Sequence, residues 1–424
     1  MGTPFRGTDY FKITVLGFAL AAVANTMHAI ILPLRIQDLV GGELKSTYLG
    51  LLTFAGLVIA ILVQPIAGAV SDRSGFHWGR RRPFILAGII AALIMLFGLG
   101  TADLYVIVFI FWCLMQASLN VAQGPFQAFI PDLVPSGKRG LASGVKNLIE
   151  IAGGVALLRL VGNLMSNQPT TSGNSWLWLS LGVLGLVLLA AMLITVLSVR
   201  ERPGTGISAP FNLSLLYNSF QVRVKGNSGF VLFLISRLLF IMALTTLQSF
   251  ALYYFQDVVD IVQPAKVTAD LITVVGIAML VVVYPAGRLS DKVGRKPILT
   301  ACGLLAALGI SLIISFPHYN WILFAGALIG IAAGSFLSTN WALATDLIPQ
   351  EEAGRYLGIA NLASAGGSAL ARLIGPLIDS FNGFGAGTGY SVMLGACFCY
   401  FIISSILIWQ IRIHGISQSS SSAV

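Results

Sequence analysis

The chain has 424 residues, of which 56% are hydrophobic and only 10% are charged, and its mean hydropathy is +0.87. A soluble domain carries about 25% charged residues, so this composition excludes a soluble globular protein and indicates an integral membrane protein. The net charge of +9 would suit a nucleic-acid-binding protein only with a basic face and interleaved aromatic residues on a soluble domain, so we expect no nucleic-acid partner.

Twelve apolar runs, each close to the roughly 20 residues that cross a bilayer as a helix, follow one another along the chain. Charge clusters or Gly/Pro turns separate them, and they lack the alternating pattern of barrel strands. We predict an all-α membrane protein: an N-terminal six-helix bundle in 1–198, a cytoplasmic linker in 199–226, a C-terminal six-helix bundle in 227–412 and a disordered tail in 413–424. The expected transmembrane spans are 11–33, 46–70, 83–101, 104–130, 141–165, 175–198, 228–254, 267–289, 297–316, 320–345, 355–379 and 388–411.

The first span, 11–33, is interpreted as a membrane helix and not as a signal peptide, because no small-residue cleavage site follows it. It carries two polar side chains, Asn25 and His28. Polar residues inside a membrane helix are costly, and they therefore mark candidate solute pathways. For His28 the alternative is a hydrogen-bonded packing residue.

The loop after the second span has a counterpart after the eighth: residues 68–85 read GAVSDRSGFHWGRRRPFI and residues 287–298 read GRLSDKVGRKPI. DLVP at 132–135 likewise returns as DLIP at 346–349. Such repeats, half a chain apart, predict two related halves side by side about an axis along the membrane normal. The carboxylates can pair with arginines and latch the halves together; alternatively, the basic residues only anchor the cytoplasmic face. The candidate latch residues are Gly68, Asp72, Arg73, Arg80, Arg81, Arg82, Asp132, Asp291, Arg295 and Asp346.

In the fourth span, 104–130, amide side chains recur at spacings of 4, 3 and 4 and therefore share one helix face. A stripe of amides can line a solute path, although each amide taken singly can instead join two helices. Amides beside aromatic rings suit a neutral polyol, because amides donate and accept hydrogen bonds while rings stack on C–H faces. The stripe is Gln116, Asn120, Gln123 and Gln127, and further pathway candidates in other spans are Asn147, Arg237, Gln248, Asn361 and Arg372.

Glu150 is the acidic residue that we place near mid-membrane, roughly 14 Å from the cytoplasmic end of the fifth span at 1.5 Å per residue. A carboxyl group away from water can take up and release a proton. Glu150 is therefore the candidate for proton coupling. Lys146 lies one helical turn away, so the alternative is a self-neutralising pair without a role in transport.

The two related halves, the charged loops after the second and eighth spans, and RERP at 200–203 resemble the major facilitator superfamily over the whole chain. Within it, QP at 64–65, GRRRPFI at 79–85 and QGP at 123–125 resemble the sucrose/proton symporters, a glycoside-pentoside-hexuronide-like group, and their bacterial relatives. The resemblance implies the major facilitator fold and secondary transport by alternating access. Those symporters carry an Arg where this chain has Gln127, so the resemblance also implies a different coupling arrangement here.

Lys and Arg residues are distributed unequally between the two expected sides of the membrane. With a cytoplasmic N-terminus, eighteen lie in cytoplasmic connections and three, Arg35, Lys45 and Lys266, lie in outer ones. The positive-inside rule then predicts a multi-pass protein of the plasma (inner) membrane with both termini in the cytoplasm.

Motifs for enzymatic chemistry are missing from the sequence. The glycine-rich run at 383–389 has no Lys and follows no strand, so it does not predict a phosphate site, and no Walker A motif occurs. The four cysteines are expected to pack as small apolar residues inside the spans. We expect no cofactor, no metal and no enzyme, but a monomeric symporter in the lipid bilayer that moves a sugar or similar neutral polyol together with a proton. The alternatives are a proton-coupled exporter of amphipathic small molecules and a non-transporting sensor with a transporter fold.

Overall fold

The computed structural model describes residues 7–166, 175–201, 228–347 and 353–411. Within these ranges the chain is helical, without strands, and twelve helices are long and apolar enough to cross a membrane. This confirms the predicted all-α fold with twelve spans. Of the predicted linker, only 199–201 are described, and the predicted tail, 413–424, lies outside the described residues.

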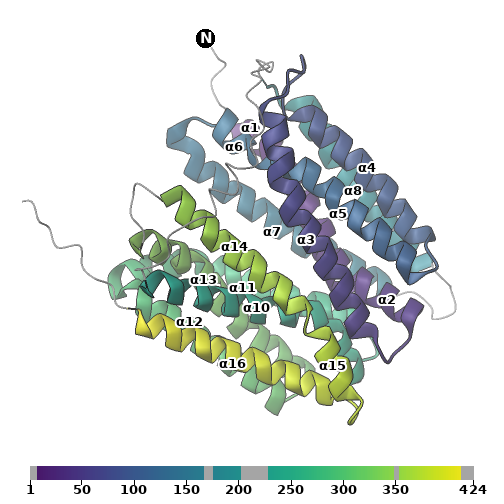
Figure 1. The fold of residues 1–424 in the computed structure, drawn as a ribbon, viewed down its shortest axis with the longest axis vertical. Helices are drawn as coiled ribbons and strands as arrows, with labels where there is room; N and C mark the ends of the chain where they lie inside the picture. The colour runs from purple at the N-terminus through teal and green to yellow at the C-terminus, as the bar shows by residue number, and fades with distance from the viewer. Residues whose placement is uncertain (1–6, 167–174, 202–227, 348–352, 412–424) are drawn as a thin grey trace, which may run out of the picture.

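The N-terminal half, shown from purple to teal-blue in Figure 1, forms helices because apolar runs must satisfy their backbone groups internally in lipid. Pro65 and Pro125 lie inside two of these helices, and a membrane helix tolerates such prolines where other groups satisfy the freed backbone. The elements are α1 (Gly7–Thr26), η1 (Met27–Ile31), α2 (Leu32–Val40), α3 (Lys45–Asp72), α4 (Arg82–Thr101), α5 (Tyr105–Gln127), α6 (Phe129–Leu133), η2 (Ser136–Lys138), α7 (Arg139–Ser166) and α8 (Ser175–Ser198).

The C-terminal half, from green to yellow in Figure 1, repeats this arrangement. Gly326, Gly330 and Gly334 lie on α13 where it packs against α11, and a Cβ on Gly330 would lie only 2.6 Å from the Val275 carbonyl oxygen. These glycines therefore let the two helix backbones touch. The elements are α10 (Ser228–Asp257), α11 (Pro264–Val293), α12 (Arg295–Ser315), α13 (Tyr319–Leu347), α14 (Ala353–Arg372), α15 (Gly375–Asn382) and α16 (Thr388–Gln410).

The first span differs from its predicted bounds, because the helix continues past residue 33 to Val40. Pro33 cannot donate a backbone hydrogen bond, which should break an α-helix. The chain instead widens into a π-helical turn, Met27–Ile31, immediately before this proline. Asn25 and His28 lie just before and within that turn.

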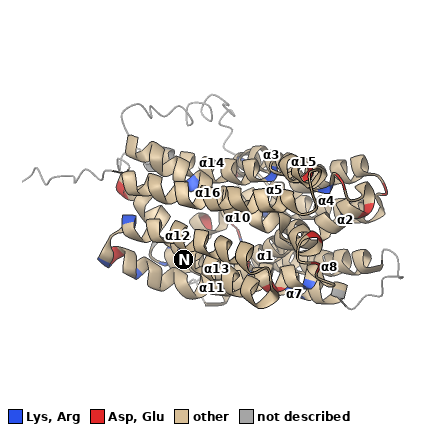
Figure 2. Cartoon of the chain, turned by 90° about the horizontal axis from the view of Figure 1, so that it is seen from below, with Lys and Arg blue, Asp and Glu red and all other residues tan. Residues whose placement is uncertain are grey.

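The two sides of the molecule are named here by the chain connections. The linker side carries the start of α1, the end of α8, the start of α10 and the end of α16, and the opposite side is called the distal side. Figure 1 shows the halves converging toward α2 and α15 on the distal side and splaying apart toward α6 and the start of α14 on the linker side. Charged residues lie mainly toward the helix ends, and the middles of the helices are almost uncharged (Figure 2).

Candidate functional site

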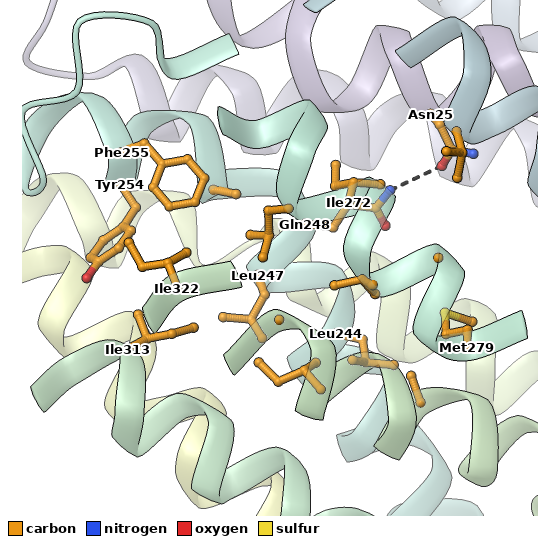
Figure 3. Close-up of a pocket in the computed structure, with 18 of the residues that line it drawn as sticks. Asn25, Leu244, Leu247, Gln248, Tyr254, Phe255, Ile272, Met279, Ile313 and Ile322 are labelled. Carbon is orange, nitrogen blue, oxygen red and sulfur yellow. Dashed lines mark hydrogen bonds between the residues drawn. The ribbon is translucent and has the colours of Figure 1, made fainter. Parts of the chain in front are cut away.

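Two amides predicted as pathway residues meet between the halves. Gln248 of α10 donates a hydrogen bond from Nε2 to Oδ1 of Asn25 on α1, over 3.2 Å. Gly154 of α7 lies against the Asn25 amide, and a side chain at position 154 would overlap that amide. Both amides line a cavity of about 340 Å³ (Figure 3). The cavity is therefore bounded by both halves, with a polar edge where they touch.

The rest of this cavity is apolar. Figure 3 shows side chains of the C-terminal half pointing into it from several helices. Such a lining can hold the apolar part of a solute, while the two amides give direction to its polar part. The labelled apolar and aromatic members are Leu244, Leu247, Tyr254, Phe255, Ile272, Met279, Ile313 and Ile322.

His28 faces the fourth span across the N-terminal half. Its ring lies edge-on to Trp112 of α5, with 5.1 Å between ring centroids. Its Nδ1 lies 2.8 Å from the Ala24 carbonyl oxygen, so in the neutral form Nδ1–H donates and Nε2 is an acceptor. The Trp112 indole nitrogen is buried without a protein partner among the described residues. The His28 ring thus offers Nε2 as an acceptor, and the Trp112 ring offers its indole N–H as a donor.

The amide stripe on α5 divides into residues with different environments. Asn120 is buried and donates from Nδ2 to the Gln116 carbonyl of its own helix, over 2.8 Å. Gln123 is half-buried, whereas Gln127 is the last residue of α5 and is exposed. Outside the stripe, the linker-side candidates Asn147 and Asn361 are exposed on α7 and α14.

Arg237 of α10 lies inside the C-terminal half and is only 4% exposed. Its Nε donates to the Ser364 hydroxyl over 2.6 Å, its NH1 donates to the Asn340 side chain, and its guanidinium lies over the Trp341 ring at 4.5 Å. The partner Asn340 was not predicted, because no periodic pattern marks it on α13. Arg237 is thus stabilised by neutral groups and a ring rather than by a carboxylate.

Arg372, at the end of α14, is likewise held by neutral groups. It is 9% exposed, its NH1 donates to the Ser368 carbonyl, and its Nε has no protein partner among the described residues. On the next turn, the hydroxyls of Thr245 and Ser368 are 3.2 Å apart and link α10 to α14.

Glu150 of α7 pairs with Lys146, with 3.2 Å between Oε1 and Nζ. The Glu150 side chain is 29% exposed and packs against Gly17 of α1. The ion pair that the sequence allowed is therefore formed. A role in proton coupling stays a prediction.

The predicted latch residues form networks within each half. Arg81 of the first charged loop donates to Asp72 and, over 3.0 Å, to Asp132, while Arg80 lies 2.7 Å from Asp132. In the C-terminal half, Arg295 pairs with Asp346 over 2.6 Å, and Asp291 is exposed. On the linker side these charges are therefore tied to their own halves.

The close contact between α3 and α5 near Gly68 depends on a glycine of α5. A Cβ on Gly68 would meet nothing within 4 Å, whereas one on Gly124 of α5 would lie 3.0 Å from the Gly68 nitrogen. Gly124 therefore permits the close packing of α5 on α3. Arg82 donates to the Trp78 carbonyl over 2.9 Å, which orders the loop between α3 and α4. Arg73 ends α3 as its C-cap residue.

Glu201, just after α8, belongs to the RERP sequence at 200–203, but it was not among the predicted site residues. Its carboxylate accepts the backbone N–H groups of Arg81 over 2.8 Å and Arg82 over 3.0 Å, and so caps the start of α4. Gly79, at φ +126°, brings the loop against it. Burial raises the pKa of the Glu201 carboxyl, while the hydrogen bonds from Arg81 and Arg82 oppose that rise.

On the distal side the contacts cross between the halves. Within the described residues, two ion pairs join the halves, Lys45 to Asp257 over 2.8 Å and Arg159 to Asp270. The structure is thus joined on its distal side and splayed on its linker side. The described part of the chain holds no cluster of three or more His, Cys, Asp or Glu side chains.

A family model described as "MFS/sugar transport protein" matches residues 14–407. The minor myo-inositol transporter IolF of Bacillus subtilis (strain 168) is 32% identical over 91 residues, covering 22% of this chain and 21% of that protein. Sucrose transport protein SUC4 of Arabidopsis thaliana is 33% identical over 138 residues, covering 28% and 25%. The chain thus spans a quarter or less of either relative. The crystal structure of a D-xylose–proton symporter has a TM-score of 0.73 at 16% identity, covering 96% of this chain and 98% of that one, which is a likeness of fold.

Proposed function

Since this chain belongs to the MFS/sugar transport protein family, it is a membrane transporter, and we propose that it moves a sugar or similar neutral polyol together with a proton. Transport would proceed by alternating access, with the splayed linker side as one of its two end states. The relatives named for myo-inositol and sucrose support a polyhydroxylated solute. Glu150, the acid paired with Lys146 in α7, is our candidate for the proton site.

The observation that carries this proposal is the Asn25–Gln248 hydrogen bond at the edge of the cavity. The bond joins the two halves at a point that a solute must separate if it is to bind both. Each amide offers a donor and an acceptor, as the hydroxyl groups of a polyol require. A polyol that replaces the bond would therefore contact both halves at once, which is what couples occupancy to their movement.

Uptake by the purified protein in proteoliposomes tests the proposal. The panel is radiolabelled myo-inositol, sucrose and D-xylose, each assayed with and without an imposed pH gradient and with a protonophore as control. We expect at least one of these solutes to accumulate only under the gradient, with protein-free vesicles as the baseline. Equilibration without accumulation would refute proton coupling, and no uptake of any polyol would refute the solute class.

A second candidate function is proton-coupled export of amphipathic small molecules. The apolar lining of the cavity favours it, since Leu244, Leu247, Ile272 and Ile322 offer no hydrogen bonds. Leu247→Asn distinguishes the two: it should weaken export of an amphipathic cation strongly and alter polyol uptake little. The opposite order of effects would favour the polyol.

We also propose that the linker side faces the cytoplasm, because the Lys and Arg residues of the connections gather there. Gly140 on that side and Gly42 on the distal side suit cysteine reporters, because a Cβ on either would meet nothing within 4 Å. In intact cells an impermeant maleimide should label Gly42→Cys, and it should label Gly140→Cys only after permeabilisation. The reverse pattern would invert the assignment.

We propose that the latch residues join the two halves in the opposite access state, in which the linker side is closed. Asp72 is bonded to Arg81 within its own half here, so we propose that it contributes to holding the linker side closed when the distal side opens. Asp291 and Arg295 would do the same in the C-terminal half. The Asp72 side chain is 56% exposed and Asp291 is also exposed, so both carboxylates can be reached by the opposite half.

Asp72→Asn should slow the transport cycle, because it weakens one end state without touching the cavity. We expect maximal transport to fall severalfold while KM changes by less than about twofold. Asp9→Asn is the matched control, since it removes the partner of Lys12, 3.0 Å away, within the same half and on the same side. If Asp72→Asn transports at the wild-type rate, Asp72 has no latch role, and the charged loop at 68–85 serves only to anchor the cytoplasmic face.

A further inference from the structure

The start of α3 is capped by a carboxylate from the other half. Asp379 of α15 accepts the backbone N–H of Thr47, the third residue of α3, over 2.6 Å. The residue at the N-cap position of α3 is Leu44, whose side chain cannot cap, and the first turn contains Lys45 but no acid. The positive end of this helix therefore depends on Asp379, which is itself only 8% exposed.

Backbone contact sets the position of this cap. A Cβ on Gly375, at the start of α15, would overlap the Ser46 carbonyl oxygen, and one on Gly50 of α3 would overlap the Arg372 carbonyl oxygen. Only glycine permits such an approach at both positions. The first two turns of α3 are thus docked against the α14–α15 junction while the distal side is closed.

A second acid of the C-terminal half holds the same helix end. The Lys45 ammonium, on a residue only 5% exposed, lies 2.8 Å from Asp257 at the end of α10 and 4.7 Å from the centroid of the Tyr253 ring. Asp257 also accepts the Tyr390 hydroxyl. Breaking this pair would leave the buried Lys45 ammonium without its carboxylate, which is costly unless water reaches it.

A third acid makes the second ion pair between the halves. Asp270 of α11 pairs with Arg159 of α7 and accepts the Tyr319 hydroxyl over 3.0 Å. The two helices also touch beside this pair, since a Cβ on Gly162 of α7 would lie 2.7 Å from that of Ala269 of α11. The Lys45–Asp257 and Arg159–Asp270 pairs thus have the same polarity, with the acid on the C-terminal half and the positive group on the N-terminal half.

We infer that Asp257, Asp270 and Asp379 form the distal gate of the transporter: they hold Lys45, Arg159 and the start of α3 in the state described here and release them when the distal side opens. They act as positioning residues, because they contact neither the cavity nor its amides. The linker-side ion pairs, Arg81 to Asp72 and Arg295 to Asp346, lie within single halves in this same state. This inference does not depend on which solute is carried.

Two reporter cysteines measure the state of the gate. Ala251 lines the cavity on the distal half of α10 and is sealed from the distal side by the gate, while Gly144 of α7 is exposed on the linker side. In Lys45→Gln and Asp379→Asn, an impermeant maleimide applied from the distal side should label Ala251→Cys about tenfold faster. In the same variants, Gly144→Cys should be labelled more slowly from the linker side.

Asp103→Asn is the matched control, because it breaks a distal-side ion pair, Arg35 to Asp103 over 3.2 Å, within one half; its labelling rates should equal those of the parent. The exchanged pair Lys45→Asp with Asp257→Lys should restore slow labelling. Unchanged labelling of Ala251→Cys in Lys45→Gln would overturn the gate, as would faster labelling of both reporters, which indicates general loosening. Should Asp379→Asn fail to reach the membrane, Lys45→Gln decides alone, since it leaves Asp257 with Tyr390 as a partner.

Discussion

Glu150→Gln is expected to abolish accumulation of solute against its gradient while leaving exchange across the membrane intact. The amide keeps the shape and the hydrogen bonding of the side chain, but it cannot ionise. With one proton per solute, a gradient of one pH unit supplies about 1.4 kcal/mol, which supports about tenfold accumulation in the parent. The variant should stop near equal concentrations inside and outside, measured in proteoliposomes under an imposed gradient.

The Lys146–Glu150 pair offers a sharp control for that result, because Glu150→Gln also leaves Lys146 without its partner. The double variant Lys146→Gln with Glu150→Gln removes both charges. If Glu150 carries the proton, the double variant should also fail to accumulate solute. Recovery of accumulation in the double variant would mean that the acid serves only to neutralise the lysine.

Gln248→Ala should raise KM strongly with little change in maximal transport. The substitution removes one amide of the cavity edge and leaves Asn25 without its partner. Loss of such hydrogen bonds costs about 1–3 kcal/mol, or roughly 5- to 150-fold in affinity. The measurement is the concentration dependence of polyol uptake, with KM and maximal rate fitted separately.

Ser118→Ala is the control for Gln248→Ala, because the Ser118 hydroxyl donates to the Leu114 carbonyl of its own helix over 2.8 Å and takes no part in the cavity. Asn25→Ala should reproduce the rise in KM, and the double variant should add little to either change. An unchanged KM in Gln248→Ala would leave the amide pair as a contact between the halves only.

The fold could be predicted from the sequence because hydrophobic length decides it. A run of roughly 20 apolar residues in a bilayer has few structural choices other than a helix, so the number of spans followed directly. The end of the first span was not predicted correctly. Pro33 normally indicates that an α-helix ends, but here the backbone widens into a π-helical turn and the helix continues. The repeat at 68–85 and 287–298 predicted related halves, but not the access state in which they would be found.

The site could be predicted only in part, because its residues meet across helices distant in sequence. Asn25 and Gln248 were each marked by polarity, yet their contact depends on how the halves pack. Lys45 was counted only as an outer charge, and nothing in its own segment pointed to Asp257. The sequence did contain one local signal that α3 is capped from outside its own segment. The helix begins after Leu44, whose side chain cannot accept a hydrogen bond, so its first N–H groups need an acceptor such as Asp379 from another part of the chain.

The π-helical turn at 27–31 has a consequence for helical register. A turn wound through one extra residue shifts everything on one side of it by one position, which is about 100° of rotation around the helix axis. Asn25 faces Gln248 and the buried Arg35 donates to the Ala102 carbonyl, two bonds on opposite sides of that turn. Deleting a single residue from the turn would leave the span long enough to cross the bilayer, but it would turn one of these side chains away from its partner. An insertion or deletion in this span is therefore tolerated only if Asn25 and Arg35 keep facing their partners.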